Sequence, residues 1–358
     1  MANQHFDLMV IGAGIVGLSI AVEAAYSMPG KIACFDMHGV ANSVGASGDG
    51  LRLFRLSYFE HASYVPLLRD AIEGWKELGD DLYVPSGGLY AGPADSILVS
   101  GSLESALQHD IDHRLLTAGE VRQQYPHFQL PSDYVGFLEA EGGYVRAAKA
   151  TQAMAEKAQR LGVEIKTERA MGITPVGDRW LVTSESGNYI CERLVIAAGA
   201  ATPELVPALK RHIHREPHLV VWFDSPDWTD LPGFGIMDEN EEMLYGFPAV
   251  DDKPGVKVGG HYRFENSALP AQEQRLVELT SRFMPELSRN IVHRRSCDYD
   301  VSPDGHFILG EVEPGLMVAC GFSGHGFKFG SIIGKLIWEF AHGECPEELS
   351  FLDVGRFI

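Results

Sequence analysis

Three glycines near the N-terminus have the spacing of a turn that binds a dinucleotide. Gly12, Gly14 and Gly17 follow a short apolar segment, Phe6–Ile11, that is typical of a buried strand. The first glycine allows a tight turn, the second lets the backbone approach a pyrophosphate, and the third lets a helix pack closely on the strand. The N–H groups at the start of that helix would bind the phosphates. A glycine-rich turn in a buried hairpin of helices is the purely structural alternative.

The elements around this turn support the dinucleotide interpretation. We expect a helix over Gly14–Ser27 and a second strand over Lys31–Asp36. Asp36 stands 19 residues after Gly17, where a carboxylate would accept hydrogen bonds from ribose hydroxyls. A later segment, Leu194–Ala200, is predicted to be a strand that runs into small residues, and it looks like the second strand motif of FAD-binding folds. Together the two segments favour FAD over a nicotinamide cofactor.

The rest of the chain alternates between helical and sheet-like segments, which indicates two interleaved domains. Further helices are expected over residues 66–78, 147–161, 271–283 and 326–342. Further strands are expected over residues 163–166, 180–183, 194–197 and 316–319. Residues 80–135 are rich in Gly, Pro and short apolar runs and are expected to belong to a sheet, and residues 208–300 show sheet-like alternation. The pattern predicts a mixed α/β fold.

Composition and charge exclude several classes of protein. Acidic residues outnumber basic ones by 49 to 29 in 358 residues, for a formal charge of −20. Nucleic acids and anionic membrane surfaces attract basic proteins, so neither is an expected partner. The 5 cysteines contain no C-x-x-C pair, which argues against a zinc site or a disulfide framework and favours a reducing compartment. The chain starts without the basic segment of a signal peptide, and we expect a cytoplasmic protein.

Four later segments resemble one family. They are GLRLFRLSY at 50–58, YGFP with VKVGGH at 245–261, CDYDVSPDGHFILG at 297–310 and GFSGHGFKFG at 321–330. They are similar to monomeric sarcosine oxidase and N-methyltryptophan oxidase, which are flavin amine oxidases of the glycine/D-amino acid oxidase superfamily. The resemblance extends from Phe6 to about Leu336.

The resemblance implies a division of the chain into two domains. A Rossmann-like FAD-binding domain would comprise residues 1–82, 136–207 and 299–358. A substrate-binding domain, built on a mainly antiparallel sheet as in D-amino acid oxidase, would comprise residues 83–135 and 208–298.

The resemblance also implies which residues hold the cofactor. Cys297 matches the family cysteine that bonds covalently to the flavin, and Arg294 and Arg295 would favour its reactive thiolate. A buried structural cysteine is the alternative for Cys297. Backbone N–H groups at the start of the last helix would face the flavin edge that becomes negative on reduction. The residues expected to bind FAD are Gly12, Ala13, Gly14, Ile15, Val16, Gly17, Asp36, Ser47, Arg52, Ala170, Ala198, Gly199, Cys297, Gly324, Gly326, Phe327 and Lys328.

The same resemblance implies how substrate and oxygen are handled. Arg55 and Lys328 match the pair of cations that binds the substrate carboxylate, although a surface ion pair is the alternative for each. Lys257 matches the lysine that activates oxygen, because a fixed cation stabilises the charge that oxygen gains with its first electron. An exposed strand lysine is the alternative. The residues expected around the reacting atoms are Lys257, His261, Arg52, Tyr245 and Tyr299.

Two departures from the family pattern concern the pocket. Ser47 and Gly48 stand in the short segment before Arg52 where the family usually has a histidine, so we expect a roomier or differently charged pocket. Ala200 stands where the family often has tryptophan. Sarcosine itself is therefore an open choice of substrate.

These observations predict an FAD-dependent oxidase of a secondary amine in a small N-methyl or cyclic amino acid, such as sarcosine, N-methyltryptophan or pipecolate. The imine product would hydrolyse, and O2 would be reduced to H2O2. We expect a monomer that binds a small amino acid and O2, and no metal ion. The alternatives are a dehydrogenase of the same fold that passes electrons to a carrier, a primary-amine oxidase, a nicotinamide-dependent dehydrogenase and a non-catalytic dinucleotide sensor.

Overall fold

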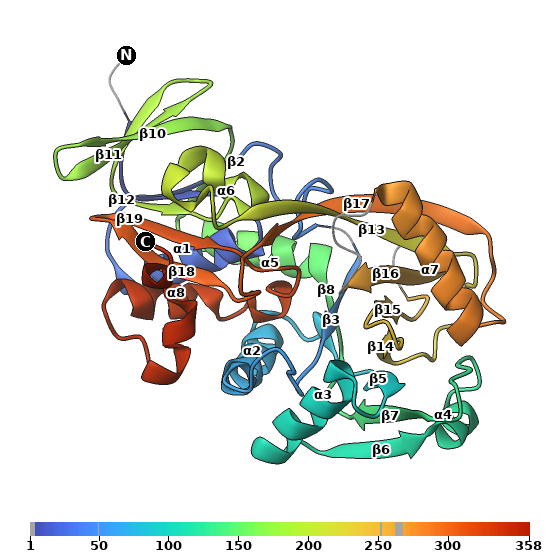
Figure 1. Ribbon diagram of the computed structural model, residues 1–358. Coiled ribbons are helices and arrows are strands. Elements are labelled where there is room, and N and C mark those ends of the chain that lie inside the picture. The colour runs from blue at the N-terminus through green and yellow to red at the C-terminus, as the bar shows by residue number, and fades with distance from the viewer. Residues whose placement is uncertain (1–3, 49, 251–252, 262–267) are drawn as a thin grey trace.

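The computed structural model describes residues 4–48, 50–250, 253–261 and 268–358. Two large sheets organise this part of the chain, one at the upper left and one at the right of Figure 1. A small third sheet lies between them in sequence and joins β3 (Leu51–Phe54), β8 (Gly143–Arg146) and β4 (Tyr83–Val84). The chain passes from one large sheet to the other several times, so the two halves are interleaved as the sequence predicts.

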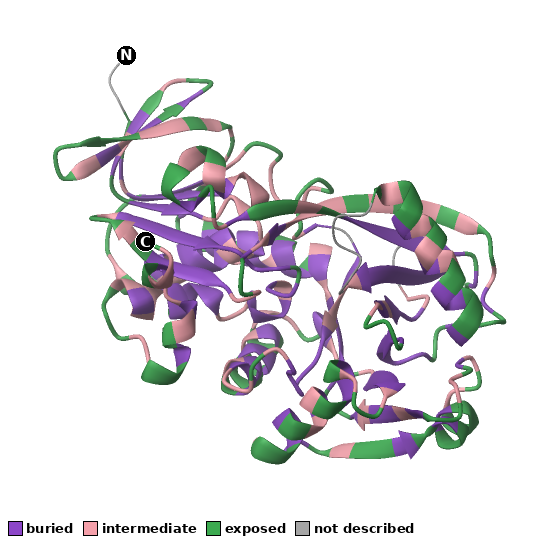
Figure 2. Ribbon diagram, in the orientation of Figure 1, coloured by how far each residue is buried: buried purple, intermediate pink, exposed green. Residues whose placement is uncertain are grey.

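The first sheet is built on parallel strands and is buried at its centre. β1 (Gln4–Ile11) pairs in parallel with β2 (Ile32–Asp36) on one side and β12 (Asn188–Ile196) on the other. Leu8, Met9 and Val10 are fully buried, as a central parallel strand requires. The sheet is completed by β9 (Glu164–Thr167), β10 (Ala170–Val176), β11 (Arg179–Ser184), β18 (Ile308–Glu313) and β19 (Leu316–Cys320). Figure 2 shows these central strands as buried and the β10–β11 hairpin as a mixture of exposed, intermediate and buried residues.

Helices cover one face of the first sheet, and the closest contact uses a glycine. α1 (Ile15–Ser27) packs against α8 (Ile333–Ala341). A Cβ atom at Gly334 would lie 2.2 Å from the carbonyl oxygen of Ser19, so only glycine allows the two helices to come this close. The other helices are α2 (Tyr64–Leu78), α3 (Ile97–Gln108), α4 (Ala118–Gln124), α5 (Ala147–Arg160), α6 (Thr202–Leu205) and α7 (Leu269–Phe283).

The second sheet is mainly antiparallel, as predicted. Its order is β17-β13-β16-β15-β14-β5-β7-β6, and within the described residues the pair β14–β5 is parallel while the other neighbours are antiparallel. Its strands are β5 (Gly88–Pro93), β6 (His113–Thr117), β7 (Tyr134–Glu139), β13 (His214–Phe223), β14 (Gly233–Met237), β15 (Met243–Phe247), β16 (Val256–His261) and β17 (Ile291–Val301).

Helix α7 is fixed to this sheet by one buried amide. The Gln272 side chain accepts a hydrogen bond from the Leu219 backbone N–H and donates one to the Pro217 carbonyl, each at 2.8 Å. The pairing of β13 with β16 covers Val220–Phe223, so the Gln272 amide satisfies backbone groups of β13 just before that pairing begins. Behind Gln272, Leu276 and Phe283 pack into the apolar core of the second sheet.

The last predicted helix is shorter than expected. Within residues 326–332 only η3 (Phe327–Phe329), a 3-10 turn, is helical, and α8 begins at Ile333. The Trp75 indole N–H donates to the carbonyl of Lys328 at 2.9 Å, and the Ile332 N–H bonds to Phe329 instead. The carbonyl of Lys328 therefore does not accept the hydrogen bond from the Ile332 N–H that an α-helix would require. The expectation that the last helix begins at Gly326 is wrong.

Two further differences concern the middle of the chain. Residues 80–135 contain the helices α3 and α4 as well as strands, although only sheet was expected there. Strand β7 spans the predicted domain boundary at 135–136, and β17 spans the one at 298–299. The proposed division into domains remains a prediction whose boundaries these strands cross. The other 3-10 helices are η1 (Gly199–Ala201), η2 (Pro207–Leu209), η4 (Glu347–Leu352) and η5 (Val354–Arg356).

Candidate active site

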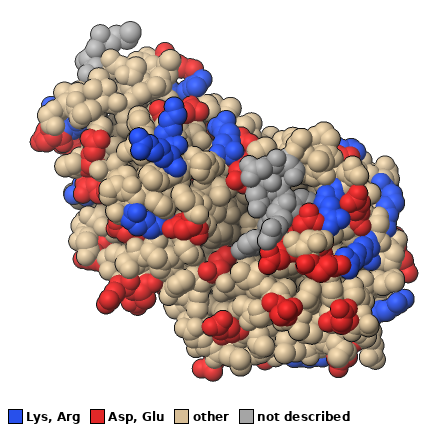
Figure 3. All heavy atoms as spheres, viewed as in Figure 1, with Lys and Arg blue, Asp and Glu red and all other residues tan. Residues whose placement is uncertain are grey.

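A cavity of about 660 Å³ is lined by residues of the first sheet, the second sheet and β3. The space-filling view shows a hollow between the two parts of the molecule (Figure 3). Of the predicted site residues, Gly17 is buried in α1 and does not line the cavity. Those that do are Gly12, Ala13, Gly14, Ile15, Val16, Asp36, Ser47, Arg52, Arg55, Ala170, Ala198, Gly199, Tyr245, Lys257, His261, Cys297, Tyr299, Gly324, Gly326, Phe327 and Lys328.

The glycine turn has the tight geometry that its sequence predicts. Gly12 has φ of +112°, and a Cβ there would lie 2.2 Å from the carbonyl oxygen of Ala197. A Cβ at Gly17 would lie 1.8 Å from the carbonyl oxygen of Gly12. Both glycines are therefore required for the strand ends and the helix to meet. The Ala13 N–H donates to Asp36 Oδ2 at 3.0 Å, and so the acid at the end of β2 lies beside the turn.

Two arginines hold the loop that lies next to this turn. Arg295 on β17 donates hydrogen bonds to the carbonyls of Ser43, Gly45 and Gly48 at 2.7–3.0 Å. Arg52 on β3 donates to the carbonyls of Ala46 and Gly48. The hydroxyl at the end of this loop, Ser47 Oγ, accepts from the first N–H of α1, on Ile15, at 3.0 Å. The loop is thus tied to both sheets and to the helix N-terminus.

Cys297 lies on β17 and is partly buried at the wall of the cavity. It faces His218 across the β13–β17 ladder. Arg294 projects to the exposed side and forms an ion pair with Glu273, so the expectation that it supports the Cys297 thiolate is wrong. Arg295 shares the cavity wall with Cys297 and donates to the loop carbonyls described above.

Tyr299, two residues after Cys297, is held in a narrow position. Its ring stacks on His218 with a centroid distance of 4.0 Å. A Cβ at Gly324 would lie 2.3 Å from Tyr299 Cε2, so the glycine of the GFSGHGFK motif makes room for this ring. Burial raises the pKa of both Tyr299 and Tyr245, which hydrogen-bond to each other, so both hydroxyls are protonated at neutral pH. Burial also lowers the pKa of His218 to about 4, and its imidazole is neutral.

Arg55 is buried rather than exposed, so the surface-pair alternative is wrong for it. Only 4% of its side chain is accessible, and its guanidinium forms an ion pair with Glu60. The guanidinium carbon lies 4.1 Å from the ring centre of Phe59 and 4.9 Å from that of Tyr58. Aromatic faces and one carboxylate therefore hold a cation at the wall of the cavity.

Lys328 is a second buried cation in the same region. Its Nζ donates to the carbonyl of His325 at 2.7 Å and to the hydroxyl of Tyr58 at 3.3 Å. Burial and the positive charge of Arg55 lower its pKa to about 7, while the charge of Glu60 opposes this shift. A bound anion would offset both effects, because it stabilises the protonated amine.

Lys257 is also buried, which removes the exposed-strand alternative. It is 2% exposed, donates to the Leu51 carbonyl at 2.9 Å and lies 5.2 Å from the ring centre of Trp222. His261 follows at the end of the same strand, and burial lowers its pKa to about 3. The ring of His261 is therefore neutral at physiological pH and adds no charge to the cations.

Four polar residues of this site were not singled out from the sequence. Glu60, Tyr58 and His325 contact the buried cations, and Asp300 is a buried carboxyl at the cavity wall. Tyr58 and His325 fall inside the motifs that carry the resemblance, which is the signal that could have found them. Asp300 also falls inside one of these motifs, whereas Glu60 lies outside them and offers no such signal, because an isolated acid is usually a surface residue.

The profile of one known family matches residues 7–339, and its description is "FAD dependent oxidoreductase". This range includes the glycine turn, both large sheets and the buried cations. The chain belongs to this FAD-dependent oxidoreductase family. The D-amino acid oxidase-like fold expected from the sequence is thereby confirmed.

Known proteins and one solved structure are similar to this chain over nearly its whole length. A monomeric sarcosine oxidase of Streptomyces avermitilis is 31% identical over 99% of this chain and 98% of its own. An N-methyl-L-tryptophan oxidase of Citrobacter koseri is 28% identical over 99% of this chain and 100% of its own. The solved structure of NikD, an amino acid oxidase of nikkomycin biosynthesis, superposes with a TM-score of 0.84 at 22% identity and covers 98% of each chain.

The residues of this family member fit FAD. The glycine turn leaves a cradle that a Cβ would fill, and α1 presents its N-terminal N–H groups beside it. Asp36 closes that end, and the cavity continues to Cys297 and Lys328. Its volume of about 660 Å³ is in the usual range for cofactor sites. The described residues contain no cluster of histidine, cysteine and acidic side chains suited to a metal ion. Nor does any helix among them have the length and apolar character needed to cross a membrane.

Proposed function

We propose that this protein is an oxidase that uses FAD to oxidise a secondary amine in a small N-methyl or cyclic amino acid. The observation that carries the proposal is the pair of buried cations, Arg55 and Lys328, in the cavity that also contains the dinucleotide turn and Cys297. Two buried cations close to one acid, Glu60, leave an excess of positive charge. A substrate carboxylate would balance that excess.

Arg55 and Lys328 would bind the substrate carboxylate together, since each cation lies 4.9 Å from the centre of the Tyr58 ring. The carboxylate has to compete with Glu60 for Arg55, since the two are already paired. Binding would therefore exchange one carboxylate for another at the guanidinium and place the amine at a fixed distance from it. Bidentate recognition by arginine would set the orientation of the substrate.

The neutral groups of the site suit an uncharged amine. His261 and His218 are uncharged at neutral pH, and Tyr245 and Tyr299 are protonated. These groups would exclude water and offer hydrogen bonds without adding charge beside the amine nitrogen. When bound, the flavin would supply the redox chemistry: it would accept a hydride equivalent from the C–H bond next to the amine nitrogen, so that the C–N bond becomes the C=N bond of the imine, and O2 would reoxidise it and leave as H2O2.

Lys257 would serve the oxygen step. Its ammonium is fixed by the Leu51 carbonyl and by aromatic rings in a buried position. A charge held in place in low-dielectric surroundings stabilises developing negative charge without reorganisation. Cys297 would carry the covalent link to the flavin, since it is the partly buried free thiol in the cavity wall. The monomeric state and the cytoplasmic location remain predictions from the sequence.

The test is a screen of amino acids against the yellow protein under two conditions. Without oxygen, N-methyl and cyclic amino acids should bleach the flavin absorbance, and the primary amino acid of the same side chain should do so more slowly. In air, the same substrates should produce H2O2 in proportion to oxygen consumed. Bleaching without peroxide formation, and with rapid reduction of an artificial dye, would instead identify a dehydrogenase. Bleaching by none of these compounds would contradict the proposal.

A further inference from the structure

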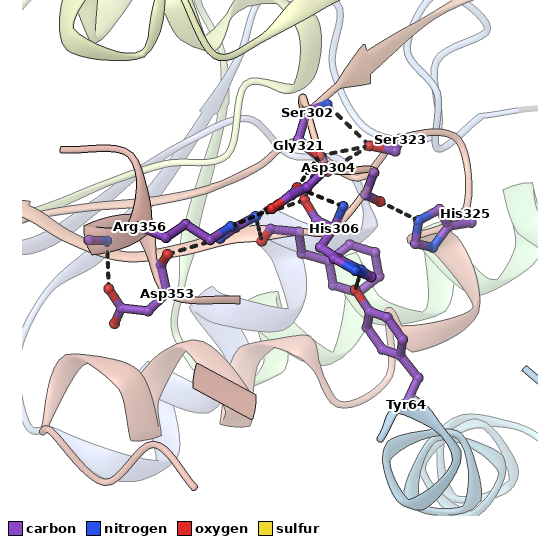
Figure 4. A network of polar contacts seen from close by, with 12 residues as sticks. Tyr64, Ser302, Asp304, His306, Gly321, Ser323, His325, Asp353 and Arg356 are labelled. Atoms are coloured by element: carbon purple, nitrogen blue, oxygen red, sulfur yellow. Dashed lines mark hydrogen bonds and ion pairs between the residues drawn. The ribbon is translucent and has the colours of Figure 1, made fainter. Parts of the chain in front are cut away.

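The hydroxyl of Tyr58 lies between Lys328 and the imidazole of His325. Tyr58 Oη is 2.6 Å from His325 Nδ1 and 3.3 Å from Lys328 Nζ. His325 Nε2 is 2.8 Å from the carbonyl oxygen of Gly305. Tyr58 is fully buried, Lys328 is 6% exposed and His325 is 8% exposed. Figure 4 shows His325 beside the 302–306 loop, with its ring directed at a backbone oxygen of that loop.

The direction of each hydrogen bond in this chain of contacts can be assigned. The carbonyl of Gly305 can only accept, so His325 must carry its proton on Nε2. Burial and the charge of Lys328 lower the pKa of His325 well below its usual range, so the imidazole has no second proton. Nδ1 must then accept, and the hydroxyl of Tyr58 donates to it. The oxygen of Tyr58 is left as an acceptor, and Lys328 donates to it.

This assignment determines how the Lys328 amine is oriented. One N–H is directed to the carbonyl of His325 and a second to the oxygen of Tyr58. Nζ has one remaining position, and Lys328 lines the cavity. That position carries a third proton when the amine is charged and a lone pair when it is neutral. Only the charged form can donate to a carboxylate from this position.

We propose that Tyr58 and His325 are positioning residues that aim the third proton of Lys328 into the cavity and keep the amine protonated for carboxylate binding. The inference rests on the proposed function, because the carboxylate is that of the substrate. It adds to the cation a series of hydrogen bonds, here called the relay, that runs from the Gly305 carbonyl through His325 and the Tyr58 hydroxyl to Lys328. Arg55 also contacts Tyr58. The guanidinium carbon of Arg55 and Nζ of Lys328 each lie 4.9 Å from the centre of the Tyr58 ring.

The charged and titratable groups around the relay set the sign of the pH dependence. Arg55 lowers the pKa of Lys328 and Glu60 raises it. His306 and Arg55 also disfavour the protonation of His325. The Tyr58 oxygen stabilises the ammonium because it accepts a hydrogen bond from a charged donor. Loss of that oxygen should lower the pKa of Lys328 further, and carboxylate binding should be lost at a lower pH.

Tyr58→Phe isolates the hydroxyl, since the ring that contacts both cations is retained. Tyr64→Phe is the matched control: Tyr64 is equally buried, packs against Tyr58 at 5.2 Å and directs its hydroxyl at His306 instead (Figure 4). The flavin-loaded protein is titrated with benzoate from pH 6 to 9, and the dissociation constant is read from the flavin absorbance. In Tyr58→Phe we expect binding about tenfold weaker at neutral pH and lost about one pH unit earlier.

Two substitutions of His325 separate the relay from a merely structural role. Asn places an acceptor near the Nδ1 position and can still receive the Tyr58 hydroxyl, whereas Gln reaches toward the Nε2 position and can still donate to Gly305. The relay predicts that His325→Asn keeps the wild-type pH profile better than His325→Gln. If His325 only supported the 302–306 loop, the order would be reversed, and that result would overturn the proposal.

A second measurement does not depend on turnover or on any carboxylate. The rate at which acetic anhydride acetylates Lys328, followed by mass spectrometry against pH, reports the pKa of the amine in the protein as purified. Tyr58→Phe should shift this profile to lower pH and Tyr64→Phe should leave it in place. An unchanged profile in a Tyr58→Phe variant with wild-type thermal unfolding would refute the relay. Failure of all amines to bleach the flavin would refute the proposed function and leave this labelling result intact.

Discussion

Asp300 offers a direct test of the electrostatics of the cavity wall. Its side chain is 6% exposed, and its Oδ2 has no hydrogen-bond partner among the described residues. Burial raises the pKa of Asp300 from 3.8 to about 6, although hydrogen bonds from the backbone of Phe322 and Gly321 act in the opposite direction. The carboxylate is therefore charged at neutral pH in a place that disfavours its charge.

The size of this effect follows from the shift in pKa. The rise in the pKa of Asp300 from 3.8 to about 6 corresponds to about 3 kcal/mol, at about 1.4 kcal/mol for each tenfold change in the ionisation constant. Between about pH 4 and pH 6 the folded protein binds a proton that the unfolded chain releases. The contribution of Asp300 to the free energy of unfolding thus falls as pH rises through this window, and the loss is complete above pH 6.

Asp300→Asn removes the charge and keeps the shape of the side chain. The amide group of the asparagine would take the place of Oδ2 and would have no hydrogen-bond partner there. This lowers the free energy of unfolding by about 1–3 kcal/mol at every pH. The informative quantity is therefore the change in the mutational effect between two pH values. We expect the variant to gain about 3 kcal/mol relative to the wild type between pH 4 and pH 8. Equilibrium urea unfolding of both proteins, as purified, measures this difference.

The neighbouring acid supplies the control. Asp298 lies two residues away on β17, is 43% exposed and pairs with Arg215 at 3.4 Å. Asp298→Asn should show little change in its effect between the two pH values, because exposed pairs contribute little. An Asp300→Asn effect that is the same at pH 4 and pH 8 would show that the burial argument is wrong.

Three further predictions concern the proposed chemistry. Cys297→Ala should release the yellow colour into the supernatant on denaturation, whereas the wild-type protein should stay yellow; colour lost from both would exclude the covalent link. Arg55→Ala should raise the KM for an acidic substrate by about 10- to 100-fold, as expected for a lost charge-assisted hydrogen bond, and an unchanged KM would contradict carboxylate binding there. Lys257→Met should spare anaerobic flavin reduction and slow reoxidation by oxygen; equal losses in both half-reactions, followed by stopped-flow absorbance, would remove its oxygen role.

The N-terminal unit could be predicted because its requirements are local. A glycine is needed at Gly12 for φ of +112°, and another at Gly17 for the contact with the Gly12 carbonyl, whatever the rest of the fold does. The motifs around Cys297 and Lys328 could be recognised because several residues of each motif occur in one short segment. Several strand and helix positions then followed within a few residues, but the helix expected from residue 326 begins at Ile333, and α3 and α4 lie where sheet was expected.

The remaining features depend on contacts between distant segments. The Trp75 bond to the Lys328 carbonyl ends the expected helix, and it joins residues 253 positions apart. Tyr58 and His325 are 267 positions apart, so no periodicity could show that they share a proton. The burial of Lys257 is likewise set by β3 and by Trp222 of the neighbouring strand. The charge of Lys328 and the protonation of His325 depend on how deeply each side chain is buried, which cannot be predicted from the sequence alone.

The loop at residues 43–48 has a consequence for how the protein acquires its cofactor. Its backbone oxygens receive Arg52 from one side and Arg295 from the other, and both guanidinium groups bond to the carbonyl of Gly48. Freeing this loop means breaking bonds to β3 and to β17 at once. Entry and exit of a dinucleotide are therefore coupled to loosening of the seam between the two halves, and a ligand enclosed there would lock that seam shut and slow its own escape.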